Sequence, residues 1–189
     1  MNQRVRNRVL VSGCEGETDG CNTQLLYFTC SSLTKDDRYL FMITDRGGSP
    51  NIMARDLQSG EERILTANRD GVMKSYVYFD CAPGKGLSKA SVCLDTDGAV
   101  AYYIRDNLIC KVGLDGTEKV LARVPDDRVT AFTHVSQDGR YLCVPQTAAR
   151  ALDYDPETEG SGLDRRPVFD LDARVQEEDL SSWLCVYDT

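Results

Sequence analysis

Residues 33–66 contain three short, largely apolar runs separated by polar turns. The runs are Tyr39–Thr44, Asn51–Leu57 and Glu61–Leu65. The first consists mainly of β-branched and aromatic residues and the second alternates apolar with polar positions, as strands do. Asp, Ser and Gly in the turns hydrogen-bond to the nearby backbone or accept positive φ. Strands this short do not bury an apolar face alone, so the pattern predicts a repeated neighbour.

The same unit returns twice later in the chain. Each copy begins with a polar turn, and the anchoring aspartates are Asp37, Asp97 and Asp138, which are 60 and 41 residues apart. Repeats of roughly 40–50 residues with four short strands are typical of β-propeller blades. The sequence therefore predicts an all-β fold, a β-propeller fragment of about three four-stranded blades.

The repeats divide residues 1–189 into successive parts of one partial propeller. Residues 1–24 are expected to form an N-terminal strand and loop. The predicted blades cover residues 25–66, 76–124 and 129–189. An insertion at 145–181 interrupts the third blade, and its end, Asp172–Leu180, has the pattern of a short helix. A long insertion is usually functional or disordered, so it is either a lid-like excursion or a surface decoration.

The chain is short for a closed ring. Propellers have 4–8 blades, so a complete ring of blades this size needs roughly 300 residues or more, whereas this chain has 189. We therefore expect the sequence to be the N-terminal part of a longer protein. An incomplete ring exposes unpaired strand edges, and for this reason we also expect self-association.

Composition and charge exclude several classes of protein. Hydrophobic residues at 41% and charged residues at 28% indicate a globular chain. A net charge of −8 argues against a nucleic-acid partner, which requires clustered Lys and Arg. No apolar run approaches the ~20 residues that cross a bilayer, and Val9–Val11 before Cys14 is too short for a signal peptide. We expect no membrane contact and a cytoplasmic location.

Eight cysteines and a single histidine offer little for metal binding. No cysteine pair has C-x-x-C spacing, so a structural zinc site is not predicted. Cys93, Cys143 and Cys185 lie inside strand patterns, where a thiol behaves as a small hydrophobe. Free thiols of this kind are typical of a reducing cytoplasm. The residues themselves predict no metal ligand and no cofactor in this chain.

Alternating strand directions place several loops at one end of the predicted blades. These are the loops at 45–50 and 106–107 and the insertion. Arginine binds carboxylates through two parallel hydrogen bonds, so this end is predicted to recognise an acidic ligand. The candidate binding residues are Arg46, Arg105, Gln146 and Arg150, with Arg165 and Arg166 further along the insertion. The alternative is that the arginines are solvated or pair with Asp45, Asp106 and Asp164.

Residues 26–145 and 182–189 resemble the N-terminal half of the oligogalacturonate lyase family. The motifs that carry the resemblance are LYFTCSSLTKDDRYLFMITDRGGSPNIMARDLQSGEERILT, YYIRDNLICKVGLDGTEKVLARVP and HVSQDGRYLCVP. The resemblance implies a seven-bladed propeller and β-elimination on pectin-derived uronate oligomers in the cytoplasm. It also implies a histidine base and a manganese ion, held largely by histidines, that binds the uronate carboxylate.

The resemblance places no catalytic residue in this sequence. The base and metal ligands of the family lie in later blades, and the position of His134 corresponds to an aromatic residue in the family. The isolated chain is therefore expected to be inactive, with manganese and an acidic oligosaccharide as ligands of the complete protein only. Two other functions remain open, a non-catalytic propeller for carbohydrate binding or protein interaction, and the propeller portion of a prolyl-type peptidase.

Overall fold

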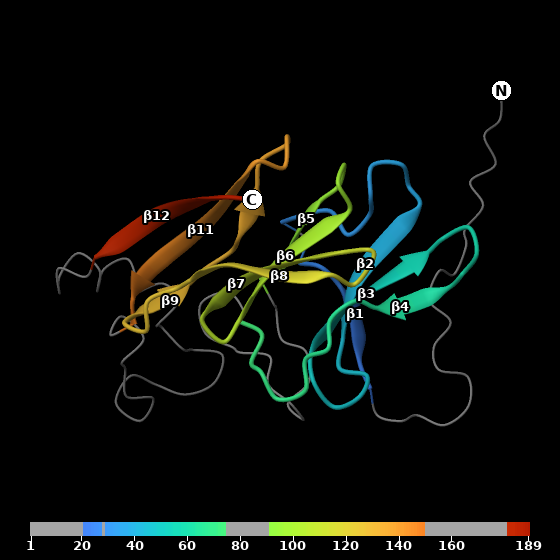
Figure 1. Ribbon diagram of the computed structural model, residues 1–189, viewed down its shortest axis with the longest axis horizontal. Helices are drawn as coiled ribbons and strands as arrows, with labels where there is room; N and C mark the ends of the chain where they lie inside the picture. Colours follow the sequence, from blue (N-terminus) through green and yellow to red (C-terminus); the bar gives the residue numbers. More distant parts are fainter. Residues whose placement is uncertain (1–20, 28, 75–90, 150–180) are drawn as a thin grey trace, which may run out of the picture.

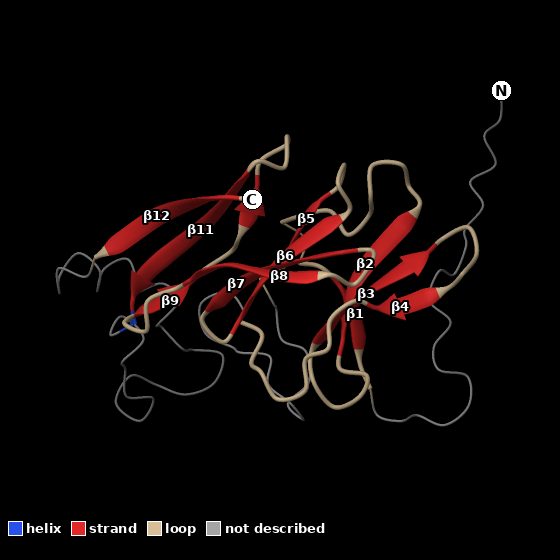
Figure 2. Cartoon of the chain, in the orientation of Figure 1, coloured by secondary structure: helices blue, strands red, loops and turns tan. Residues whose placement is uncertain are grey.

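The computed structural model describes residues 21–27, 29–74, 91–149 and 181–189. These residues form three antiparallel β-sheets that follow one another along the chain (Figures 1 and 2). The predicted all-β, propeller-like architecture is thereby confirmed. The predicted helix at Asp172–Leu180 lies outside the described residues, as does most of the insertion.

The first sheet has the strand order β1-β2-β3-β4. Its strands are β1 (Thr23–Leu25), β2 (Tyr39–Thr44), β3 (Asn51–Asp56) and β4 (Glu62–Ile64). Each strand pairs with the next in antiparallel register, so short turns suffice to connect β2, β3 and β4. This is the up-and-down order that the three apolar runs predicted.

The second sheet repeats this order as β5-β6-β7-β8. Its strands are β5 (Cys93–Asp95), β6 (Val100–Arg105), β7 (Leu108–Gly113) and β8 (Glu118–Arg123). The β6–β7 turn is closed by Asp106, whose φ of 53° lies in the left-handed region. The sheet therefore presents its turns at the same relative positions as the first sheet.

The third sheet departs from the pattern. It contains β9 (Arg128–Thr130), β10 (His134–Val135), β11 (Tyr141–Ala148) and β12 (Ser182–Asp188). Both β9 and β10 pair with β11, and β12 also pairs with β11 along its full length. The segment that leads into the third turn is thus split into two short strands, and this sheet is three strands wide.

The core lies between successive sheets. Phe41 and Ile43 of β2 pack with Tyr103 of β6 between the first and second sheets. Tyr102, the neighbour of Tyr103 on β6, points the other way and packs with Leu142 of β11. Successive side chains of a strand alternate between faces, so β6 is buried on both faces. Each large apolar side chain buried in this way contributes roughly 1.5–3 kcal/mol to folding.

The cysteine expectation is met in part. Cys93 is buried, and burial raises the pKa of its thiol to about 12. Cys143 and Cys185 are only half-buried. Cys143 of β11 lies opposite the exposed Val186, and Cys185 lies on β12, which has no further strand beside it in the described part of the chain. None of these three thiols forms a disulfide.

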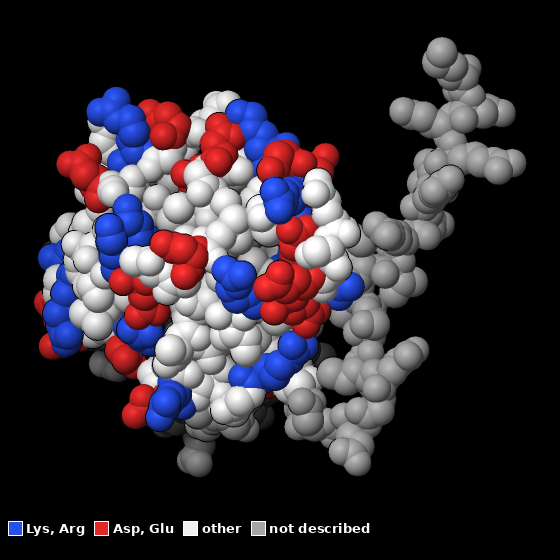
Figure 3. Space-filling view, turned by 45° about the vertical axis from the view of Figure 1, so that its right-hand side comes forward, with Lys and Arg blue, Asp and Glu red and all other residues white. Residues whose placement is uncertain are grey.

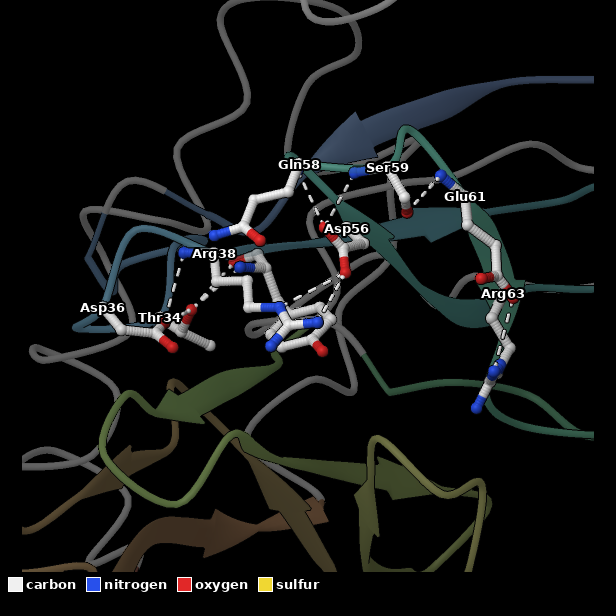
Figure 4. Close-up of polar contacts among 9 residues, drawn as sticks. Thr34, Asp36, Arg38, Asp56, Gln58, Ser59, Glu61 and Arg63 are labelled. Carbon is white, nitrogen blue, oxygen red and sulfur yellow. Dashed lines mark hydrogen bonds and ion pairs between the residues drawn. The ribbon is translucent and has the colours of Figure 1, made fainter.

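The turn that opens the first blade is organised by Asp36 rather than by the predicted Asp37. Asp36 accepts hydrogen bonds from Thr34 Oγ1 at 2.6 Å and from Arg38 N at 3.1 Å (Figure 4). Asp37 instead adopts a φ of 57°, and Gly139 holds the corresponding place in the third turn with a φ of 69°. The prediction was one residue out, because adjacent aspartates have the same turn-forming chemistry.

The third turn repeats these contacts. Ser136 Oγ donates to Asp138 Oδ1 at 2.6 Å, and Arg140 N donates to the same oxygen at 3.2 Å. The hydrogen bond from Ser136, followed by that from Arg140, lowers the pKa of the Asp138 carboxyl. The stabilisation from the carboxylate is present above the unfolded pKa of about 3.9 and is lost as the pH falls through the lower native pKa.

We expect Asp138→Asn to weaken the acid dependence of stability. The wild-type chain loses free energy of unfolding as the pH falls below about 4 because the carboxylate must take up a proton. An asparagine oxygen accepts the same hydrogen bonds without titrating, so the variant loses less. Urea unfolding between pH 7 and pH 3 measures the difference, with Gln137→Asn in the same turn as the control. Parallel pH profiles for wild type and Asp138→Asn contradict the prediction.

Candidate binding site

A groove of about 650 Å³ opens along the outer part of the seam between the first and second sheets. Its walls come from β4, the connector that follows β4, the end of β6 with the turn after it, and the start of β8 with the turn before it. Its lining includes Arg63, Asn68, Arg69, Gly71, Arg105 and Glu118. The volume lies within the range of small-molecule binding sites.

The connector is held in place by the buried amide of Asn51. Asn51 Nδ2 donates to Ser49 O and to Asn68 O, both at 3.0 Å. Its Oδ1 accepts from Thr66 Oγ1 and from Asn68 N, both at 2.8 Å. The side chain therefore makes all four hydrogen bonds available to an amide. Because the site is buried, these bonds fix the path of the connector that forms the groove wall.

Gly71 brings this connector against the second sheet. A Cβ atom at position 71 would lie 2.7 Å from Asn68 Oδ1 and 2.9 Å from Arg105 Cδ. Asn68 Oδ1 itself accepts a hydrogen bond from Gly71 N at 2.9 Å. Only glycine allows the backbone to approach both side chains this closely.

Arg105 is fixed at the groove by Glu118. Its two terminal nitrogens donate to the two oxygens of Glu118 at 2.7 and 3.0 Å, and the hydroxyl of Tyr103 donates to Glu118 as well. Burial has the largest single effect on the Arg105 guanidinium and lowers its pKa, but the hydrogen bond to Glu118 and the negative charge of Glu118, with smaller contributions from Tyr103 and Cys110, together raise the pKa overall. Burial, followed by the bond to Glu118, raises the pKa of Tyr103. Asp106, the partner considered for Arg105, instead accepts from Val72 N.

The other predicted binding residues lie elsewhere. Arg46 donates to Glu62 at 3.0 Å, at a site that is not part of the groove wall. Gln146 is 2% exposed and donates to Tyr187 OH at 2.9 Å. Arg150 lies outside the described residues. Of the four predicted residues, the described part of the structure places only Arg105 at the groove.

Two arginines at the groove were not predicted. Arg63 of β4 donates across the seam to Leu114 O at 3.3 Å and pairs with Glu61 at 3.3 Å, while its side chain remains 58% exposed. Arg69 is exposed on the connector. Arg63 lies in the predicted strand Glu61–Leu65 and Arg69 lies between the predicted first and second blades, so neither was a predicted ligand contact. The signal that was available is the Asn-Arg-Asp-Gly sequence at 68–71, which places an arginine within a tight turn.

A second hollow of about 270 Å³ continues the seam toward the turns of the first sheet. Arg38 donates to Asp56 at 3.1 Å and lies over the ring of Tyr39 at 4.9 Å in this region (Figure 4). Arg63 lines both hollows. The seam therefore offers an extended surface with one arginine shared between its two parts.

Positive and negative side chains are interspersed at the surface (Figure 3). In the groove, Arg63, Arg69 and Arg105 face four acidic residues, which are Asp70, Asp106, Asp115 and Glu118. With three guanidinium groups against four carboxylates in its lining, the groove has no excess of positive charge and is poorly suited to a dense polyanion.

The described residues do not fit a manganese site. Among them, no group of three or more His, Cys, Asp or Glu side chains is placed to hold a metal ion. His134 is exposed on β10 and does not line the groove.

No helix in the described ranges is long and apolar enough to span a membrane.

Stacked, sequential antiparallel sheets of this kind define the chain as a propeller-type protein. In fold it is similar to an oligogalacturonate lyase from Vibrio parahaemolyticus, with a TM-score of 0.64 and 17% identity over 92% of this chain and 39% of that chain. It is also similar to an oligogalacturonate lyase in complex with manganese, with a TM-score of 0.57 and 18% identity over 74% of this chain and 34% of that chain.

The predicted resemblance to the oligogalacturonate lyases is therefore confirmed at the level of fold. No family model and no curated protein sequence matches the chain. The chain corresponds to less than two fifths of the length of either solved structure, at 39% and 34%.

We expect Asn51→Ala to lower the free energy of unfolding by about 2–4 kcal/mol, because it leaves buried backbone and hydroxyl groups of the connector without partners. Urea unfolding measures this change. Asn107→Ala is the matched control, since the Asn107 amide makes one exposed hydrogen bond to Asp126, and its cost is expected to stay below about 0.5 kcal/mol. Equal costs for the two variants contradict the assigned role of Asn51.

Proposed function

We propose that this chain binds acidic oligosaccharides of the uronate class as part of an oligogalacturonate-lyase-like protein. The observation that carries the proposal is the similarity in fold to oligogalacturonate lyase structures along 92% of the chain. The groove between the first and second sheets supports it, because it has the volume and the exposed arginines that such a ligand requires.

Arg63 and Arg69 are the residues proposed to contact the ligand carboxylates. Both terminal nitrogens of Arg105 already donate to the oxygens of Glu118. Arg105 therefore forms part of the groove wall and does not present an unpaired guanidinium group to the ligand. Guanidinium groups pair with carboxylates through two hydrogen bonds, and a uronate oligomer carries one carboxylate on each sugar. Exposed ion pairs are screened by salt, so the affinity falls as ionic strength rises.

The proposed reaction of the complete protein is β-elimination of pectin-derived uronate oligomers with manganese. The metal would neutralise the uronate carboxylate and make the adjacent proton easier to remove. The described residues supply neither its ligands nor a base at the groove, so this chain is proposed to bind substrate without cleaving it. We propose a cytoplasmic location, which agrees with the absence of disulfides among Cys30, Cys93 and Cys110.

A second candidate function is protein interaction. It is favoured by Leu184 and Val186 of β12, two large apolar side chains that are exposed on the third sheet. No comparable observation favours the propeller of a prolyl-type peptidase.

We expect trigalacturonate to bind the chain and Arg69→Gln to weaken binding about tenfold, because a charge-assisted hydrogen bond is worth about 1.5 kcal/mol. Isothermal titration calorimetry at low salt measures the affinity, and ultraviolet absorbance of the same mixture with added manganese is expected to stay constant. Arg123→Gln is the control, since Arg123 is exposed on β8 outside the groove. The proposal fails if trigalacturonate does not bind, or if both variants lose affinity equally.

A further inference from the structure

Within the described ranges, strand β12 leaves one edge of the third sheet open. In the first two sheets the third strand pairs on both edges, β3 with β2 and β4, and β7 with β6 and β8. β12 holds the same third position and pairs with β11, but no strand among the described residues pairs with its other edge. An open strand edge is a template for pairing with a further strand.

The hydrogen bonds between β11 and β12 show which backbone groups face the open edge. Thr189 N donates to Arg140 O at 3.1 Å, and Ala148 N donates to Ser181 O at 3.0 Å. Odd-numbered residues of β12 therefore direct their N–H and C=O groups toward β11. Because these directions alternate along a strand, even-numbered residues direct theirs outward. The outward-directed residues are Ser182, Leu184, Val186 and Asp188.

The first sheet shows how such an edge is used. Asp56 lies opposite the first residue of the preceding strand, as Asp188 does in the third sheet. Asp56 N donates to Glu61 O at 2.9 Å, and Ile52 O accepts from Leu65 N at 2.8 Å. Asp56 and Ile52 are the first-sheet positions equivalent to Asp188 and Leu184. Both are thus hydrogen-bonded to the segment that contains the fourth strand, β4. The edge of β12 has the backbone geometry that β4 satisfies in the first sheet.

The side chains of β12 do not protect this edge. Leu184 and Val186 are 73% and 59% exposed on the face that points away from the second sheet. On the opposite face, Trp183 is half-buried beneath the guanidinium of Arg128, which lies 3.8 Å from the ring centre. The strand carries one charged residue, Asp188, and no lysine or proline of the kind that keeps edges apart.

We propose that β12 pairs with β12 of a second copy of this chain, antiparallel about a twofold axis through Cys185. Cys185 is the middle residue of the seven in β12, so this register alone overlaps the whole strand. It places Leu184 opposite Val186 of the second copy and Ser182 opposite Asp188. All outward-directed backbone groups of both strands then have partners. The contact is self-complementary, as a twofold interface requires.

The strand itself favours a second copy as the occupant. Its outward-bonding residues are polar at the two ends and apolar on either side of Cys185. Reversing the strand therefore sets apolar positions against apolar positions. Registers shifted by two residues preserve the hydrogen-bond pattern but leave two residues of each strand without partners.

Light scattering after size exclusion tests the pairing. The wild-type chain of 21.0 kDa is expected to reach twice this mass as its concentration rises. Val186→Lys places like charges beside the twofold axis and is expected to weaken association at least tenfold. Val120→Lys is the matched control, because Val120 is 55% exposed on the outer strand β8. A monomer at every concentration, or equal loss of association in both variants, overturns the proposal.

Cross-linking tests the register. The two Cys185 residues form a non-hydrogen-bonded pair, in which the Cα atoms are about 4.5 Å apart and within reach of a disulfide. Diamide accepts two electrons and two protons as the two thiols join. Oxidised wild-type protein is expected to run as a reducible dimer, Cys143→Ser to behave the same way, and Cys185→Ser to remain monomeric on a denaturing gel. Cross-linking that survives in Cys185→Ser overturns the register.

Discussion

The structure depends on the second sheet being buried on both faces. Tyr102 and Tyr103 are adjacent in β6 and yet belong to different cores, one shared with the third sheet and the other with the first. The two-residue period of a strand makes this possible, because consecutive side chains point to opposite faces. The second sheet therefore links the other two. A one-residue change in the register of β6 would move the side chains of each core to the opposite face of the sheet.

Polar contacts then determine what the seams between the sheets present to solvent. Asn51 belongs to the first sheet but holds the connector that leads to the second, and Gly71 lets that connector approach Arg105. The groove is thus built from backbone held by a buried amide, with charged side chains added at its rim. This division separates the residues that maintain the groove from Arg63 and Arg69, the two proposed ligand contacts.

Local patterns in the sequence were sufficient for the strands and their order. Alternation, β-branched runs and turn residues act over a few neighbouring positions, so the first two sheets were predictable from Tyr39–Thr44 and its repeats. The role of Asp36 in the first turn was not predictable, since the choice between two adjacent aspartates depends on which one adopts positive φ. The third sheet was only partly predictable, because the break between β9 and β10 leaves no clear periodic signal.

The candidate site was harder to predict because it depends on contacts distant in sequence. Alternating strand direction indicated which loops share one end, but not that Glu118 would engage Arg105 or that Glu62 would engage Arg46. Arg63 and Arg69 become neighbours of Arg105 only once the sheets are packed. Pairings of this kind require the register between sheets, which a single sequence does not specify.

The position of the second sheet also sets the order in which the chain opens. Amide protons of β6 and β7 exchange with solvent only when contacts on both faces are lost, so their protection approaches that of global unfolding. The third sheet keeps one face in water at Leu184 and Val186, so it detaches at lower free energy. Local opening therefore begins at β12 and proceeds toward the second sheet. The free energy of local opening differs between the sheets and is highest for the second sheet.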